Sequence, residues 1–369
     1  MPLGIGLEDL NISAAASRPL VDRCCVKCPS AGTLGGLDSK KAVYCRPCFL
    51  QMVRHKFRAT LGKQKVFKDR QNQALLLFTG DPASVALLSL VQGGLSADAF
   101  KRLEIQPTVV CLLRSCHQED IDFVLRPGST LRLAETQFGL DWMFIHLASI
   151  FSSGPISPMV DVSHVEHLRN LLASVKGQTM RTELQNRLAI AFLYRIARQQ
   201  KVTKVVVPHT INLLSKNVLD NVSLGRGAQI SDESAVVDKR HPGISLIRPF
   251  REISDKEVAL YNRFEGLEEL LVLLPSEPSA HADPSTQRVT QEFIDGLQAG
   301  FPATVTTLVS SASKVKGPLE LKKTAGKISH CRLCFSSVEV ENSFCRPCAS
   351  LLSEVPDHSL LPEFLRDCS

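Results

Sequence analysis

Residues 75–88 read "LLLFTGDPASVALL", two apolar runs joined by a short turn. An apolar run ends at Thr79, and a turn containing Gly80, Asp81 and Pro82 leads into a second apolar run of helical composition. An apolar strand that enters a helix through a glycine turn is the unit from which parallel α/β sheets are built. The stretch therefore predicts a buried strand, a tight turn and a helix, and it raises the question of whether the turn binds phosphate.

Further runs with the composition of buried strands follow along the chain. They are "TVVCLL" at 108–113 and "KVVVPH" at 204–209, and together with "ALLLFT" at 74–79 they alternate with helical patterns over residues 71–275. The clearest helix is "RTELQNRLAIAFLYRIARQQ" at 181–200, where apolar residues recur at helical spacing. We expect an α/β domain with an open parallel sheet.

Composition sets the protein class. The chain has 369 residues, 44% of them hydrophobic and 22% charged, which is typical of a globular protein with one large domain and smaller modules. No apolar run reaches the roughly 18 residues of a membrane helix, so we expect no membrane partner. The first twenty residues lack a basic start followed by an apolar block, which predicts a cytoplasmic protein. The net charge of +6 permits a nucleic-acid partner without requiring one.

Eight of the twelve cysteines lie in Cys-x-x-Cys pairs, with two pairs near each end of the chain. Two such pairs can hold one ion by four thiolates at about 2.3 Å, as in structural zinc sites. An iron–sulfur cluster and unligated cysteines remain alternatives, and Cys24 is an alternative to Cys25. Cys111 and Cys116 have no partner at ligand spacing and are expected to be buried bystanders. The eight candidate zinc ligands are Cys25, Cys28, Cys45, Cys48, Cys331, Cys334, Cys345 and Cys348.

The segment "RHKFRATLGKQKVFKDR" at 54–70 is the most basic part of the chain. It carries seven Lys or Arg residues against the single acid Asp69, with Phe57 and Phe67 between them. Such cations can neutralise phosphates, although a solvated helix face explains the pattern equally well. The position after a cysteine module favours RNA. The candidate RNA-binding residues are Arg54, Lys56, Arg58, Lys63, Lys65 and Lys68.

Composition also divides the chain into parts. Within the α/β part, residues 291–312 are expected to add one more helix and one more strand, and the tail after Cys348 is expected to be weakly structured because of its prolines. The parts are a flexible N-terminus at 1–20, a cysteine module with the basic segment at 21–70, the α/β domain at 71–312 with an exposed loop at 275–290, and a basic linker, second cysteine module and tail at 313–369.

Several motifs in a fixed order carry a family resemblance. They are "YCRPCFLQMVRHKFRATLGK" at 44–63, "TELQNRLAIAFLYRIARQQKVTKVVVPHT" at 182–210, "LDNVSLGRGAQIS" at 219–231 and "LIRPFREISDKEVALYNRF" at 246–264. With the terminal cysteine module, they make the chain resemble the cytoplasmic tRNA 2-thiolation protein 2 family over most of its length. The resemblance implies an open parallel sheet of the adenine-nucleotide alpha-hydrolase (PP-loop) type, flanked by N- and C-terminal zinc-ribbon-like modules.

The resemblance also gives the turn at 79–84 a meaning. Active thiolases of the wider group carry Ser-Gly-Gly-x-Asp-Ser at this position, whereas this chain reads Thr-Gly-Asp-Pro-Ala-Ser. Asp81 places a carboxylate where phosphate charge should lie, a repulsion of about 4 kcal/mol at about 4 Å and an effective dielectric of about 20. Pro82 has no N–H to donate, and Ala83 replaces a carboxylate. No ATP binding is expected.

Two other catalytic motifs of such thiolases are altered. Active members place a Cys-x-x-Cys before the helix that corresponds to 183–198, but residues 176–185 read "KGQTMRTELQ". Of a Gly-His-Asn motif only His209 remains, and it is expected to be structural rather than catalytic. The resemblance therefore implies a pseudoenzyme without catalytic or cofactor-binding residues.

The function implied is that of a non-catalytic subunit in a heterodimeric tRNA thiolase. It would bind tRNA and a catalytic subunit of the same fold, and so support 2-thiolation of the wobble uridine in a subset of cytosolic tRNAs. In this family the sulfur comes from a ubiquitin-related carrier. Two alternatives remain: an ATP-dependent tRNA-modifying enzyme in its own right, and a zinc-ribbon interaction scaffold.

Overall fold

The structure is a computed structural model, and part of the chain is described. The expected flexible N-terminus at 1–20, residues 275–283 of the expected loop and most of the basic linker lie outside the described residues. The described residues are 24–35, 42–67, 72–97, 102–272, 284–315, 329–338, 340 and 343–366. Within them, no helix combines the length and the apolar character needed to cross a membrane.

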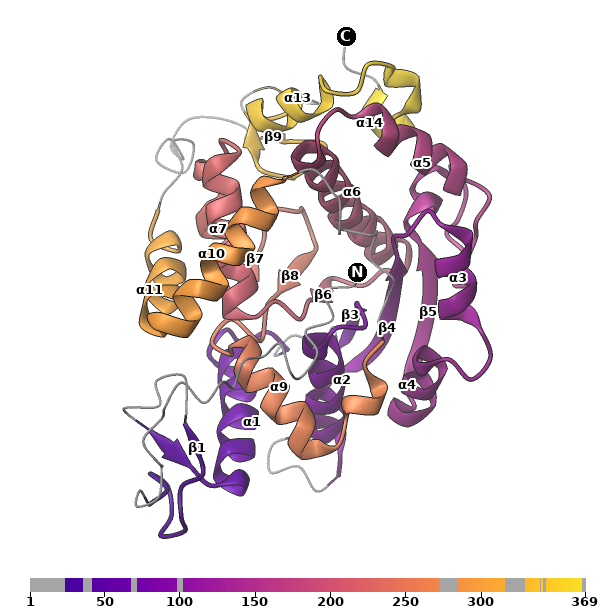
Figure 1. Ribbon diagram of the computed structural model, residues 1–369. Coiled ribbons are helices and arrows are strands. Elements are labelled where there is room, and N and C mark those ends of the chain that lie inside the picture. The colour runs from indigo at the N-terminus through magenta and orange to yellow at the C-terminus, as the bar shows by residue number, and fades with distance from the viewer. Residues whose placement is uncertain are drawn as a thin grey trace.

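A six-stranded sheet forms the centre of the molecule (Figure 1). Its strand order is β5-β4-β3-β6-β8-β7, with β7 antiparallel to β8 and all other pairs parallel. The expected α/β fold with a mostly parallel sheet is confirmed, and the three expected strands correspond to β3, β4 and β6. The strands are β3 (Gln73–Phe78), β4 (Gln106–Leu113), β5 (Asp141–His146), β6 (Lys204–Val206), β7 (Val237–Asp238) and β8 (Ser245–Ile247).

Alternate side chains of β3 enter cores on opposite faces of the sheet. Leu75 and Leu77 pack with α5 and α6, whereas Leu76 and Phe78 pack with α1, α2, α4 and α9. The helices are α1 (Arg46–Lys63), α2 (Pro82–Leu95), α3 (Gln118–Leu125), α4 (Thr130–Phe138), α5 (Val165–Ser174), α6 (Gln178–Gln199), α7 (Ile211–Ser223), α8 (Ile230–Ser234), α9 (Asp255–Glu265), α10 (Thr286–Gly300), α11 (Pro302–Ala312), α13 (Arg346–Leu352) and α14 (Glu363–Arg366).

The two cysteine modules have the same construction. In the first, β1 (Leu34–Gly35) pairs antiparallel with β2 (Val43–Tyr44) and α1 follows; in the second, β9 (Ser329–His330) pairs antiparallel with β10 (Ser337–Val338) and α13 follows. Figure 1 shows them at opposite sides of the sheet, the first in indigo at the lower left and the second in yellow at the top.

Two expectations about the C-terminal part were wrong. Residues 291–312 contain no strand, because Pro302 starts a second helix directly after α10. Val305 and Val309, one helical turn apart, pack on α7.

The tail after Cys348 is also structured. Leu351 of α13, Leu365 of α14 and Leu361 between these helices lie in the same core as α6, and each of these side chains is at most 2% exposed. Pro362 directly precedes α14, and the prolines of the tail do not prevent packing.

Candidate metal centres and the altered turn

Each module brings its four cysteines to one point. The four sulfur atoms of each group lie within 4.8 Å of one another. Cys28 Sγ lies 3.5 Å from Cys45 Sγ and 3.6 Å from Cys48 Sγ, and Cys334 Sγ lies 3.5 Å from Cys345 Sγ. In both modules the third cysteine precedes a helix and the fourth lies in its first turn. The local sequence therefore fixes the second half of each group.

These distances suit a single ion better than a cluster. A tetrahedral ion with bonds of about 2.3 Å separates its sulfur ligands by about 3.8 Å. The cysteine sulfurs of a 4Fe–4S cube are about 6 Å apart. Zinc fits this donor set and would be held by four thiolates with no open position, so the chemistry it supplies is structural. Cys24 is exposed and lies outside the first group.

The N-terminal group lies outside the two main cores. Cys28 and Cys48 are half-buried, and the backbone N–H of Lys27 lies 3.4 Å from Cys25 Sγ. Its link to the rest of the protein is α1, whose Phe49 and Val53 are buried on the face with α2 and α9.

The C-terminal group is part of the core formed with α6. Cys331 and Cys348 are fully buried. The Arg226 guanidinium, which is 1% exposed, donates from Nη1 to Cys348 Sγ at 3.3 Å, and Gln229 Nε2 donates to Cys345 Sγ at 3.5 Å. N–H donors to thiolate sulfur stabilise a metal-bound, anionic form of these cysteines.

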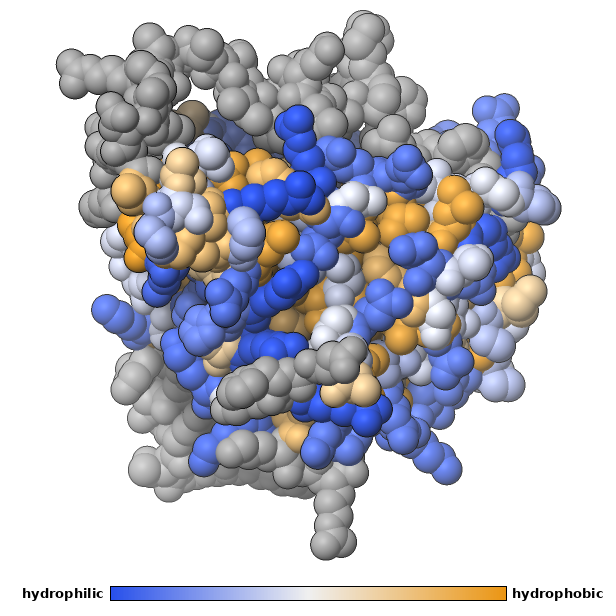
Figure 2. All heavy atoms as spheres, turned by 90° about the horizontal axis from the view of Figure 1, so that it is seen from below, coloured by the Kyte–Doolittle hydropathy of each residue, from blue (hydrophilic) through white to orange (hydrophobic). Residues whose placement is uncertain are grey.

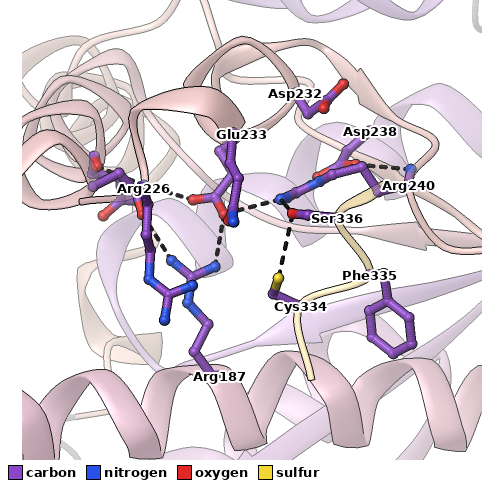
Figure 3. Close-up of polar contacts among 12 residues, drawn as sticks. Arg187, Arg226, Asp232, Glu233, Asp238, Arg240, Cys334, Phe335 and Ser336 are labelled. Carbon is purple, nitrogen blue, oxygen red and sulfur yellow. Dashed lines mark hydrogen bonds and ion pairs between the residues drawn. The ribbon is translucent and has the colours of Figure 1, made fainter. Parts of the chain in front are cut away.

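A network of ion pairs continues from Arg226 into the α/β domain (Figure 3). Arg226 Nε lies 2.8 Å from Glu183, and Arg187 contacts Glu183 and Glu233 at 2.7 Å each. Arg240 joins Glu233 to the second module, since its Nη1 lies 3.3 Å from Ser336 Oγ. We call this the buried charge network; its members are Glu183, Arg187, Arg226, Glu233, Asp238, Arg240 and Arg248.

The network holds more positive than negative side chains. Burial works to raise the pKa of Glu233, but the guanidiniums of Arg187 and Arg240 outweigh burial and hold that pKa well below its usual range. The pKa of Asp238 is likewise lowered, by Arg240 and Arg248 against the effect of burial. With all acids ionised, the four arginines face three carboxylates, and metal-bound thiolates of the C-terminal group would supply the remaining negative charge.

The turn after β3 is occupied by its own carboxylate. Asp81 Oδ1 accepts a hydrogen bond from the backbone N–H of Ser84 at 2.7 Å, and Oδ2 accepts one from Thr79 Oγ1 at 2.9 Å. Asp81 is the N-cap of α2, Gly80 takes φ +78°, and Pro82 begins the helix. A phosphate at a helix N-terminus uses these free N–H groups, and here Asp81 already uses one.

His209 follows β6 at the same edge of the sheet. Its Nδ1 is enclosed without a hydrogen-bond partner among the described residues. Burial, and then the nearby Arg248 guanidinium, lower the pKa of His209 to about 3. The ring is therefore neutral at pH 7.

The basic helix divides into paired and free cations. Arg54 pairs with Glu265 at 2.9 Å, and Lys56 Nζ contacts Glu257 at 2.7 Å, so Lys56 is directed toward α9. Phe57 is buried against Phe250 and offers no surface for a base. In the part of the chain that the structure describes, Arg58, Lys63 and Lys65 have no ion-pair partner, and Lys68 lies outside it.

Sequence reasoning missed the roles of Arg226 and Gln229. Both lie in the motif "LDNVSLGRGAQIS", where a basic residue between glycines is a weak signal. Cys111 and Cys116 are buried and lie outside both cysteine groups, as expected.

Comparisons with known proteins agree with this architecture. A family model described as cytoplasmic tRNA 2-thiolation protein 2 matches residues 285–354. The protein of that name from Caenorhabditis elegans is 32% identical over 357 residues, covering 95% of this chain and 97% of the relative, and that from Caenorhabditis briggsae is 31% identical, covering 89% and 93%. Among solved structures, the U34-tRNA thiolase NcsA of Methanococcus maripaludis with its 4Fe–4S cluster has a TM-score of 0.62 at 15% identity, covering 91% of this chain and 99% of NcsA.

Proposed function

Since the chain belongs to the cytoplasmic tRNA 2-thiolation protein 2 family, we propose that it is the non-catalytic subunit of a heteromeric tRNA thiolase. In this role it binds tRNA and a catalytic subunit of the same fold in the cytoplasm. The assembly 2-thiolates the wobble uridine of a subset of cytosolic tRNAs. The names of the relatives support the process and the compartment, and the fold shared with a U34-tRNA thiolase supports the ancestry.

The observation that carries the non-catalytic role is the position of Asp81. Its carboxylate caps α2 at the point where a nucleotide phosphate would accept the same N–H groups. A bound phosphate would have to displace this carboxylate and overcome its charge. Pro82 removes one further donor at the start of the helix.

The metal centres support the same role. Both cysteine groups form closed sites whose four ligands all come from protein, and such sites stabilise folds rather than activate substrates. We propose zinc at both, held by Cys25, Cys28, Cys45 and Cys48 in the first and by Cys331, Cys334, Cys345 and Cys348 in the second.

The test is the content of thiolated tRNA in cells that lack the protein. Complementation uses the wild type and Asp81→Asn, because Asn caps a helix as well as Asp and keeps α2 intact while it removes the charge. We expect thiolation to be lost on deletion and restored by both versions. Unchanged thiolation in the deletion would refute the proposed function.

A second measurement separates a subunit from an enzyme. The purified chain is incubated with ATP and tRNA without any other subunit, and pyrophosphate release is followed. We expect none above background. Pyrophosphate release that depends on tRNA would favour the alternative of an ATP-dependent modifying enzyme.

A further inference from the structure

A groove with a volume of about 1350 Å³ lies between α1 and α2. Residues of α9 and the segment 102–104 complete its lining. Figure 2 views the molecule from below, the side toward which α1, α2 and α9 lie in Figure 1, and shows hydrophilic side chains standing among apolar ones. Gly62 on α1 and Gly93 on α2 both line the groove, and a Cβ at either would meet nothing within 4 Å, so the groove is open at both glycines.

The rim of the groove is positively charged. Among the described residues that line it, the only acids are Glu104 and Glu265, and Glu265 pairs with Arg54. Four cations on the rim have neither an ion pair nor a hydrogen bond to a described residue, and they come from two separate segments of the chain. These cations are Arg58, Lys63, Lys65 and Arg102.

We propose that this groove binds the sugar–phosphate backbone of tRNA, an inference that rests on the proposed function for the identity of the nucleic acid. Unpaired cations along a groove are what neutralisation of phosphates requires. Of the Phe and Tyr rings in the lining, Phe57 and Tyr261 are at most 2% exposed and cannot stack on a base. The third, Phe67, is half-buried and faces the Lys204 ammonium, which lies 5.7 Å from its ring centroid. The groove therefore recognises the charge and shape of folded RNA rather than its sequence.

An acidic protein helix fits the groove less well. Such a helix would bury its apolar stripe against exposed apolar side chains. The large exposed hydrophobic side chains of the described residues, such as Phe293 on α10 and Phe301 between α10 and α11, all lie outside the groove lining.

The groove differs from the basic strip expected from sequence. Lys56 belongs to the strip but is directed toward Glu257 on α9 and does not line the groove. Arg102 lies outside the strip, 39 residues beyond Lys63 in the chain, yet it lines the same groove. Substitutions of Lys56 and Arg102 can therefore show whether tRNA binds to the groove or to the basic segment at 54–70.

The experiment is fluorescence anisotropy of labelled, unmodified tRNA with the purified full chain at several salt concentrations. Substituting all four rim cations by Gln should lower affinity at least about tenfold at about 0.1 M salt and reduce the salt-dependence slope by about one unit for each phosphate that is no longer neutralised. A matched set of exposed lysines outside the groove, also changed to Gln, should leave affinity within about twofold. The control set is Lys176, Lys201, Lys239 and Lys314.

Single substitutions distinguish groove from strip. Arg102→Gln should weaken tRNA binding, and Lys56→Gln should not. If the four rim substitutions and the four control substitutions lower tRNA affinity equally, the attraction is nonspecific and the proposal is overturned. Wild-type tRNA affinity in the variant with all four rim cations changed to Gln would also overturn the proposal. This holds even if that variant fails to bind a protein partner.

The tRNA-binding experiment and the deletion experiment can fail independently of each other. If deletion abolishes thiolation while the groove set binds tRNA like the wild type, the groove assignment is wrong and the function stands. If the groove set no longer binds tRNA but deletion leaves thiolation unchanged, the groove assignment stands and the function is wrong. Thermal unfolding of all variants checks folding, and exposed substitutions of this kind should change stability little.

Discussion

The two four-cysteine modules share their local construction but differ in what surrounds them. Each has a Cys-x-x-Cys turn, a pair of two-residue strands and a helix that starts with Cys-Arg-Pro-Cys. The N-terminal group keeps two half-buried ligands and reaches the core through α1. The C-terminal group is itself in the core and receives hydrogen bonds from Arg226 and Gln229. The same motif is thus a peripheral module in one place and a part of the domain interior in the other.

The difference has an energetic consequence. With metal bound at both groups, as proposed, its loss from the N-terminal module should remove a local structure. Its loss from the C-terminal module should also remove the thiolate beside the buried Arg226, which then has only Glu183, an acid that it shares with Arg187. An unpaired buried charge destabilises a protein by about 3–5 kcal/mol. Metal binding at the second site should therefore be coupled to the folding of the whole α/β domain.

The largest expected effect distinguishes equivalent ligands of the two modules. Cys348→Ser should lower the free energy of unfolding by about 4 kcal/mol or more, because it disrupts the metal site and the partner of Arg226 together. Cys48→Ser should unfold the N-terminal module while the sheet remains protected from hydrogen exchange. Denaturant unfolding and exchange mass spectrometry measure both. Equal global destabilisation by the two variants would show that the two modules do not differ in their coupling to the core.

A smaller effect is expected when the metal ligands are left intact. Arg226→Met should cost about 3 kcal/mol, since Glu183 loses one of its two cations in a buried site. Arg54→Met is the control, because Arg54 is half-exposed and its pair with Glu265 is worth less than about 1 kcal/mol. Thermal denaturation at equal metal content compares them. A similar small change in both variants would show that the buried charge network adds little.

The smallest effect concerns pH. The His241 ring stacks on Tyr194 of α6 at 4.4 Å and meets Phe335 of the second module at 4.6 Å. Burial, and then the Arg198 guanidinium, lower the pKa of His241 to about 4. As pH falls from 6.5 to 4 the unfolded chain takes up a proton that the folded chain does not, so this residue should reduce stability by at most about 3 kcal/mol.

His241→Phe tests the assignment because Phe keeps an aromatic ring between Tyr194 and Phe335. The variant should show a flatter dependence of unfolding free energy on pH between 6.5 and 4. An unchanged pH dependence of the free energy of unfolding would mean that groups other than His241 cause the loss of stability in acid.

The errors of secondary-structure prediction that the structure reveals lie in the C-terminal part. A strand was expected within 291–312. The β-branched residues around Val305 favour strands locally, but here they pack as a helix on α7. The weak structure expected after Cys348 rested on prolines, whereas the buried Leu361 and Leu365 show that packing outweighed them. In both places tertiary contacts overrode local preference.

Local sequence was enough to predict the strand–turn–helix unit at 73–95, the two groups of four cysteines and the altered turn at Asp81. These features depend on periodicity, ligand spacing and capping, which act over a few neighbouring residues. Only the folded chain reveals that Arg226 contacts Cys348, 122 positions away, and that Lys56 contacts Glu257, 201 positions away. Such partners depend on how helices pack on the sheet, and no short stretch of sequence encodes that packing.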